Sequence, residues 1–223
     1  MSSSWAASAL DWWREAGVDV IVGEEPRDWL SPKAKPAPLS AAPPLPDSLD
    51  AFQDWLATCA DLPFAAPGLA RARPCGDASS GLMVMVDMPS ADGALLSGAA
   101  GALFDKMLSA IGRSRETIYL AALSPVRSPG GKIDDRSALR LAEIARHHVG
   151  LVAPRALLLF GDSCGKALTG SAVAGARARW HEVPSQAGAI KTLVTIRPEK
   201  LNDMPGLKKL AWADLQMLME ALT

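Results

Sequence analysis

The chain has 223 residues, of which 49% are hydrophobic, which allows one domain with a substantial core and an N-terminal extension. Lysine and arginine number 23 against 24 aspartate and glutamate residues, so the net charge is −1. This balance argues against a protein that binds nucleic acid tightly over a broad basic surface. It leaves room for a local basic face and weak DNA binding.

The sequence also argues against membrane and secreted classes. No stretch of about 18 uninterrupted apolar residues occurs, so we expect no spanning helix and no membrane partner. Residues 1–13 lack the basic start and apolar stretch of a secretory signal. The three cysteines, Cys59, Cys75 and Cys164, are too few and too scattered for a disulfide scaffold. We therefore expect a cytoplasmic protein.

Two segments precede the predicted domain. Trp5 to Ala16 favours a short amphipathic helix that ends at Gly17. Residues 26–46 contain seven prolines among serine, alanine and lysine, which is typical of an extended linker. We therefore divide the chain into an N-terminal helix and linker over residues 1–46 and an α/β domain over residues 47–223.

Within the domain, helical patterns alternate with apolar runs typical of buried strands. Asp47 or Ser48 can cap a first helix through Thr58. We predict strands over residues 82–86, 118–123, 156–160 and 192–196, and helices over residues 99–111, 137–152, 163–168 and 207–222. This alternation predicts right-handed crossovers and a three-layer α/β/α sandwich with a mostly parallel central sheet.

In such a sheet, ligands bind at the carboxyl ends of the strands. Four segments follow the predicted strands there, namely Asp87 to Ser90, Ser124 to Gly131, Asp162 to Gly165 and Arg197 to Leu201. We expect these segments to surround one site.

One segment also matches a known catalytic motif. Gly161-Asp-Ser-Cys-Gly165 fits G-x-S-x-G between a strand and a helix, the context of a hydrolase nucleophile elbow. Ser163 would then need an acid and a histidine in that order downstream. Only His181 follows, with no acidic residue between them. The simpler interpretation is that Asp162 or Ser163 caps a helix while the glycines permit a tight turn.

The spacing of the histidines and cysteines in the sequence gives little support for a metal site. His147 and His148 are adjacent on a predicted helix and so point about 100° apart, which is poor geometry for one ion. No pair of cysteines has zinc-ligand spacing. We predict no metal site.

From Leu82 onward, short blocks in order resemble one family. Gly93 to Asp105 reads GALLSGAAGALFD against the family's G-x-P-F-x-G-x-x-G-x-L-L-D, and Arg177 to His181 reads RARWH against R-G-R-W-H. Thr195 to Pro205 falls on T-Y-H-P-A-Y-L-L-R-N-P. The chain thus resembles the bacterial family 4 uracil-DNA glycosylases, which carry an iron–sulfur cluster, and this implies their fold and a link to DNA repair.

The resemblance also implies where functional residues should lie, and several have changed. The family's first motif, G-E-x-P-G, falls on Val86 to Ser90, so Asp87 keeps a shorter carboxylate, with Met88, Pro89 and Ser90 beside it. A phenylalanine that stacks on uracil falls at Leu96, and an asparagine that reads the uracil edge falls at Ala122. The histidine that stabilises the oxyanion falls at Arg197, beside Pro198. The list of candidate substrate-binding residues is Met88, Pro89, Ser90, Leu96, Ala122 and Pro198.

The resemblance further implies four cysteine ligands for a [4Fe–4S] cluster. Their positions fall near Cys59, Leu62, Val126 and Leu141, which leaves one ligand. Cys75 lies nearby, but two sulfurs do not hold a cluster. We predict that the cluster is lost and that apolar packing fills its place.

Two hypotheses about function remain open. In the first, the chain is a degenerate glycosylase-fold protein without efficient uracil excision, a pseudoenzyme that serves as a binding or accessory module in DNA repair. In the second, it is an active DNA glycosylase, a hydrolase with altered chemistry or base specificity, in which Asp87 positions water and Arg197 stabilises the leaving base. Simpler roles also exist: Asp87 can be a helix-capping or turn residue, and Arg197 a surface or ion-pair residue.

Overall fold

The computed structural model describes Trp12, residues 44–185 and residues 188–222. The predicted N-terminal helix, apart from Trp12, and the linker up to residue 43 lie outside the described residues. The proposed boundary after residue 46 therefore stays a prediction.

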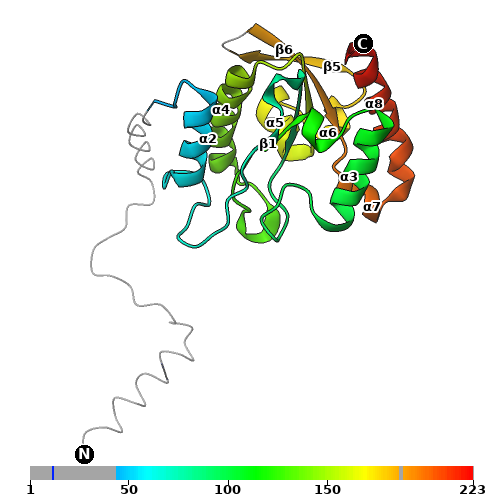
Figure 1. Ribbon diagram of the computed structural model, residues 1–223. Coiled ribbons are helices and arrows are strands. Elements are labelled where there is room, and N and C mark those ends of the chain that lie inside the picture. The colour runs from blue at the N-terminus through cyan, green and yellow to red at the C-terminus, as the bar shows by residue number, and fades with distance from the viewer. Residues whose placement is uncertain (1–11, 13–43, 186–187, 223) are drawn as a thin grey trace, which may run out of the picture. The chain divides into compact units, whose positions relative to one another are not determined.

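In the described part of the chain, one six-stranded sheet has the order β1-β3-β2-β4-β6-β5 (Figure 1). The four inner strands, β3, β2, β4 and β6, run parallel, while β1 pairs antiparallel with β3 and β5 antiparallel with β6. This confirms the mostly parallel α/β sheet. The strands are β1 (Cys75–Gly76), β2 (Leu82–Val86), β3 (Tyr119–Ala122), β4 (Ala156–Phe160), β5 (Trp180–Ser185) and β6 (Gly188–Thr195).

Helices cover both faces of this sheet. The bounds are α2 (Leu49–Thr58), α3 (Gly98–Ala110), α4 (Asp135–Val152), α5 (Asp162–Thr169), α6 (Val173–Ala176), α7 (Pro198–Asp203) and α8 (Lys208–Leu222). Helices α4, α5 and α6 pack on the face that presents Met83 and Met85, while α3 and α8 pack on the face that presents Val84 and Val86. Alternate residues of one strand thus enter two separate cores, which explains why β2 is apolar throughout.

Helix α2 forms an outer layer over α4. Ser48 caps it by accepting a hydrogen bond from the N–H of Ala51 at 3.3 Å. Phe52 and Leu56 are buried against Ile144 of α4. This confirms the predicted helix and selects Ser48 as its cap.

Two strands, β1 and β5, and two short helices, α6 and α7, were not predicted. Strand β5 contains Pro184, which lacks an N–H and is tolerated because β5 lies at the edge of the sheet. Helix α7 begins at Pro198, and proline at the first position of a helix is a signal that the sequence did contain. Strand β1 is only two residues long.

Candidate functional site

Segments that follow the four parallel strands line one pocket of about 850 Å³. It therefore lies at the carboxyl edge of the sheet, where parallel strands of this fold place ligands. Its polar and flexible lining includes Asp87 and Met88 after β2, Arg127 and Lys132 after β3, Asp162 and Ser163 after β4, and Arg197, Glu199, Lys200 and Asp203 after β6.

Asp87 lines this pocket and is only 8% exposed. One of its carboxylate oxygens accepts a hydrogen bond from the backbone N–H of Cys164 at 2.7 Å. Cys164 is the third residue of α5, so its N–H has no partner inside the helix. Asp87 therefore caps a helix that begins 75 residues later in the chain.

Gly161 makes this arrangement possible. Its φ of 111° lies in the region that favours glycine, and a Cβ atom at this position would overlap the Asp87 carboxylate. The expectation that Asp162 or Ser163 caps α5 is therefore wrong. Both lie inside the first turn, and the Asp162 carboxylate instead accepts a hydrogen bond from the N–H of Val173 at 2.8 Å.

The surroundings of Asp87 affect its charge. Burial raises the pKa of the Asp87 carboxyl above its ordinary value. Hydrogen bonds from the N–H groups of Cys164 and Ser163 and the positive charge of Arg197 lower the pKa, but by less than burial raises it. Arg197 is exposed and lies at the N-terminal boundary of α7. The two predicted catalytic residues thus line the same pocket, and their charges interact.

The residues that follow Asp87 are held in place by the loop after β3 and by Ser97, which precedes α3. The hydroxyl of Ser128 donates to the Met88 sulfur at 3.8 Å, and the Arg127 guanidinium donates to the carbonyl oxygen of Pro89 at 2.9 Å. The Ser90 hydroxyl accepts a hydrogen bond from the N–H of Ser97 at 3.2 Å. Met88 lines the pocket, whereas Pro89 and Ser90 do not.

Leu96, Ala122 and Pro198 also lie outside the pocket lining. Leu96 is 4% exposed and belongs to the core cluster that contains Phe104 and Phe160. Ala122 packs against the same cluster, and Pro198 is buried at the start of α7. Their assignment as substrate-binding residues stays a prediction.

No histidine is available to act as a catalytic base for Ser163 of the nucleophile-elbow motif. All three histidines of the chain are engaged elsewhere: His147 with the carbonyl of Pro46, His148 with the Tyr119 hydroxyl and His181 with the carbonyl of Ala176. Burial raises the pKa of the Cys164 thiol well above its ordinary value, which disfavours the reactive thiolate. Neither Ser163 nor Cys164 is therefore activated.

The charged side chains that line the pocket are balanced. Four cations face it, Arg127, Lys132, Arg197 and Lys200, against four carboxylates, Asp87, Asp162, Glu199 and Asp203. Asp162 and Glu199 lie in the segments that the sequence predicted to surround the site, whereas Asp203 lies two residues beyond them and was not predicted. A pocket with this balance offers fewer net charges to a phosphate backbone than a uniformly basic one.

The Arg177 side chain is used inside the fold. Its guanidinium donates to the Asp214 carboxylate at 2.9 Å and to the carbonyl of Leu210 at 2.8 Å. Asp214 is fully buried and also accepts a hydrogen bond from the Thr195 hydroxyl at 2.8 Å. The ion pair connects the segment before β5 to α8, and the Thr195 hydrogen bond connects β6 to the same carboxylate.

The residues near the expected cluster position do not fit a [4Fe–4S] centre. Leu62, Val126 and Leu141 are buried apolar side chains, 4% exposed or less, and Cys59 is the one thiol among the four positions. The Arg71 guanidinium donates to the carbonyl oxygens of Leu56 at 3.1 Å and Cys59 at 2.7 Å. Within the described ranges, no three histidine, cysteine or acidic side chains gather closely enough to hold a metal.

Comparison with known families gives a clear result. Residues 74–216 match the model of the uracil DNA glycosylase superfamily. The match covers more than half of the 223 residues, so the chain belongs to this superfamily, whose members bind DNA. No curated protein matches the chain. Among the helices of the described residues, none has the length and hydrophobicity needed to cross a membrane.

Proposed function

We propose that this chain is a divergent DNA glycosylase-like protein that binds DNA weakly without efficient uracil excision and acts as an accessory module in DNA repair. The observation that carries the proposal is the contact of Asp87 with Cys164 and Gly161. A carboxylate that caps α5 and packs against backbone is poorly placed to move toward water or a sugar during a reaction.

Two further changes support this proposal. A site built to read the uracil edge needs a hydrogen-bonding side chain, and the methyl group of Ala122 supplies none. At the position that the resemblance assigns to base stacking, the chain has Leu96, which packs in the core cluster that contains Phe104. Either loss alone weakens discrimination, and together they argue against selective uracil binding.

The decisive experiment is an excision assay on single- and double-stranded oligonucleotides that contain uracil. We expect no cleavage above that of a protein-free control after alkaline treatment, and excision that rises with protein concentration would overturn the proposal. Fluorescence anisotropy on the same oligonucleotides should show micromolar or weaker binding that falls steeply with salt, as contacts to phosphate do.

Substitutions of the lysines that line the pocket test whether DNA binds there. Lys132→Glu and Lys200→Glu should each weaken binding and reduce the slope of log Kd against log salt by about one. Lys191→Glu is the matched control, because Lys191 lies on β6 opposite Glu182 and does not line the pocket. Equal effects in all three variants would argue against binding at this pocket.

A second candidate function is an active glycosylase that uses Asp87 and Arg197. It is favoured by one observation, that the two residues line the same pocket and interact electrostatically. If any excision is found, Asp87→Asn should abolish it under this hypothesis. Unchanged activity in that variant would exclude a catalytic role for the Asp87 carboxylate.

A further inference from the structure

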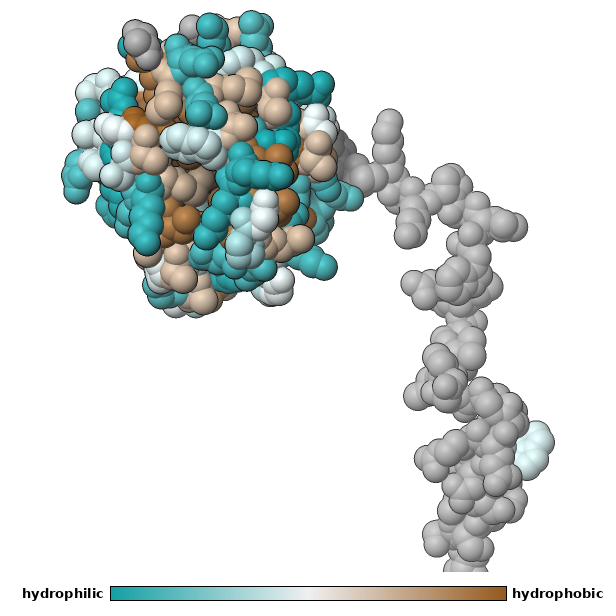
Figure 2. Space-filling model, turned by 90° about the vertical axis from the view of Figure 1, so that its right-hand side faces the viewer, coloured by the Kyte–Doolittle hydropathy of each residue, from teal (hydrophilic) through white to brown (hydrophobic). Residues whose placement is uncertain are grey.

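A shallow groove of about 170 Å³ lies on the surface formed by α3, α7 and α8. Its lining is almost entirely apolar. Buried Leu201 and Leu215 line it, together with Met107, Trp212, Lys106 and Lys208. Figure 2, which faces this side of the domain, shows hydrophobic atoms between paler and hydrophilic ones.

The packing of three helices creates this groove. Helix α3 packs closely against α7 and makes much less contact with α8, and the groove is lined by residues of all three helices. Helix α7 takes part in two sites. Leu201 lines the groove, while its neighbour Lys200 lines the large pocket.

The size of the groove sets what it can hold. A cavity of about 150 Å³ accommodates one benzene molecule, so this groove has room for a single large apolar side chain. Trp212 is 40% exposed beside it. Partly exposed tryptophans next to a pocket are typical anchors of protein interfaces, because covering them removes much apolar surface from water.

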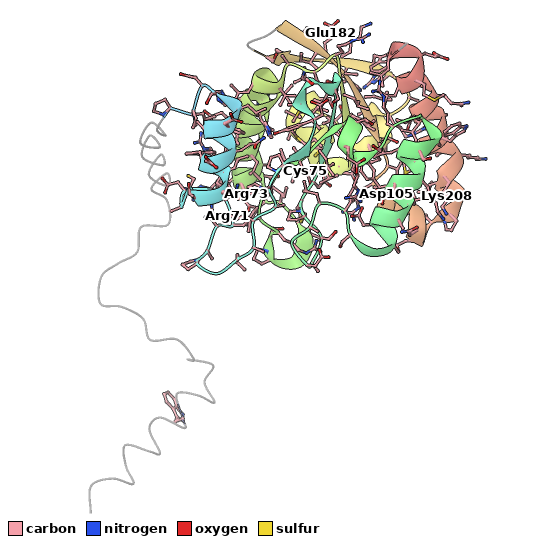
Figure 3. The ribbon with its side chains drawn as sticks, in the orientation of Figure 1. Arg71, Arg73, Cys75, Asp105, Glu182 and Lys208 are labelled. Carbon is pink, nitrogen blue, oxygen red and sulfur yellow. The ribbon has the colours of Figure 1, made fainter. Side chains whose placement is uncertain are left out.

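The charges at the groove indicate the chemistry of the occupant. Lys106 and Lys208 are both exposed, and no carboxylate is among the lining residues. Among the described residues, neither lysine forms an ion pair. Asp105, next to Lys106 in the chain, is bound to Arg115 at 2.6 Å. Figure 3 labels Asp105 and Lys208 on this side of the domain. Two unpaired ammonium groups beside an apolar groove are complementary to carboxylates.

We propose that this groove docks a short acidic segment of a partner protein, which inserts one large apolar side chain beside Trp212 and places carboxylates near Lys106 and Lys208. This interaction goes beyond the proposed DNA binding and does not depend on it. It would bring a second protein to the side of α7 that faces away from the DNA-binding pocket.

The test uses the full chain labelled with ¹⁵N and a synthetic acidic peptide, Ac-EEDFEEDE-NH2, as the probe. Titration should shift the indole N–H signal of Trp212, assigned from its loss in Trp212→Phe, together with backbone signals of α3 and α8. We expect saturable binding with a Kd of about 100 μM, as befits one anchor and a few exposed charges. The same peptide with glycine in place of phenylalanine, and a lysine-rich peptide that keeps the phenylalanine, should not bind.

Matched variants separate specific docking from general charge attraction. Lys106→Glu combined with Lys208→Glu should weaken peptide binding at least tenfold, and Trp212→Ala should do the same. Lys209→Glu is the charge control, because Lys209 neighbours Lys208 without lining the groove. Leu139→Ala is the apolar control, on a side chain of α4 that is 77% exposed. Circular dichroism establishes that each variant is folded.

Several results would overturn the proposal. Absence of saturable shifts at millimolar peptide would do so, as would equal binding of the peptide that lacks phenylalanine, or equal loss in the Lys209→Glu control. Concentration-dependent dimers in sedimentation that disappear in Trp212→Ala would instead assign the groove to a second copy of this chain. None of these outcomes bears on the excision assay.

Discussion

The carboxylate of Asp87 and the backbone N–H of Cys164 form a 2.7 Å hydrogen bond that connects the segment after β2 to the start of α5. Helix α5 follows β4, and β4 pairs directly with β2. One buried carboxylate therefore fixes the carboxyl ends of two central strands relative to each other. This places a structural contact at the point where the fold positions its ligand.

Removal of the Asp87 side chain should lower stability. Asp87→Ala leaves the N–H of Cys164 without its partner at the helix start, and loss of such a cap costs about 1 kcal/mol. Urea denaturation followed by circular dichroism measures the change. Asp50→Ala is the control, since Asp50 lies in the first turn of α2, where Ser48 provides the cap. A stability equal to that of the unaltered protein would contradict the capping role.

Asp87 should also make stability depend on pH. Because burial raises its pKa in the folded state, its contribution is fully present below the ordinary value of 3.8 and is lost as pH rises through the folded-state pKa. Asp87→Asn keeps an oxygen that can accept the Cys164 N–H but carries no charge. The difference in unfolding free energy, Asn variant minus unaltered protein, should therefore grow as pH rises from 3 to 7. A difference that shrinks with pH would mean that the ionised carboxylate stabilises the fold.

Gly161 should tolerate no side chain while Asp87 is present. Gly161→Ala places a Cβ into the Asp87 carboxylate and strains a backbone with φ of 111°, which together should cost about 2–4 kcal/mol. Combining it with Asp87→Ala should reduce this cost to the backbone strain, so the double-mutant cycle should show a large coupling. Gly175→Ala is the control, because a Cβ there meets no atom within 4 Å. Additive effects of the two substitutions would exclude the clash.

The ion pair between Arg177 and Asp214 should be strongly stabilising when only one partner is removed. Arg177→Met leaves a fully buried carboxylate without its cation, at a cost of about 3–5 kcal/mol near neutral pH. Burial already raises the pKa of Asp214 despite Thr195 and Arg177, and loss of Arg177 raises that pKa further.

The cost of Arg177→Met should consequently decline as the pH is lowered and Asp214 becomes protonated. The measurement is urea unfolding at several pH values. Arg140→Met is the control, because the Glu143 partner of Arg140 is 64% exposed and such pairs contribute about 0.5 kcal/mol. If Arg177→Met lowered the unfolding free energy by the same amount at every pH, the cause would be lost packing rather than an unpaired charge.

The architecture could be predicted from the sequence because its signals are local. Apolar runs such as Leu82–Val86 and Ala156–Phe160 are long enough to identify buried strands, and the loops after them form the pocket. Strand β1, with two exposed residues, and β5, which contains Pro184, carry no such pattern. Pairing with β3 and β6 makes them strands, and pairing is a tertiary interaction.

The contacts within the site were harder to predict for the same reason. The cap of α5 comes from Asp87, a residue far away in sequence, so the local search for a cap at Asp162 or Ser163 gave the wrong residue. The pairing of Arg177 with Asp214 likewise joins residues 37 positions apart. One local feature of the sequence did indicate the contact at Gly161. A glycine directly after a buried strand is typical of a position where another group, here the Asp87 carboxylate, packs closely against the backbone.

The end of α2 is where the family resemblance places the iron–sulfur cluster. We propose that Arg71 holds this region in place of a cluster, because its guanidinium bonds two carbonyls at the end of α2 and its backbone pairs with Val126. Arg71→Met should then cost about 2 kcal/mol, as expected when hydrogen bonds from a charged group are lost.

Arg73 provides the matched control for this substitution (Figure 3). Its ion pair with Asp54 is 4.0 Å long and mostly exposed, so Arg73→Met should change stability by less than about 0.5 kcal/mol. If no cluster holds this region, an iron chelator should leave the melting temperature of the unaltered protein unchanged. Protein purified without oxygen that absorbs near 400 nm and melts earlier after chelation would instead show that iron, and not Arg71, secures the end of α2.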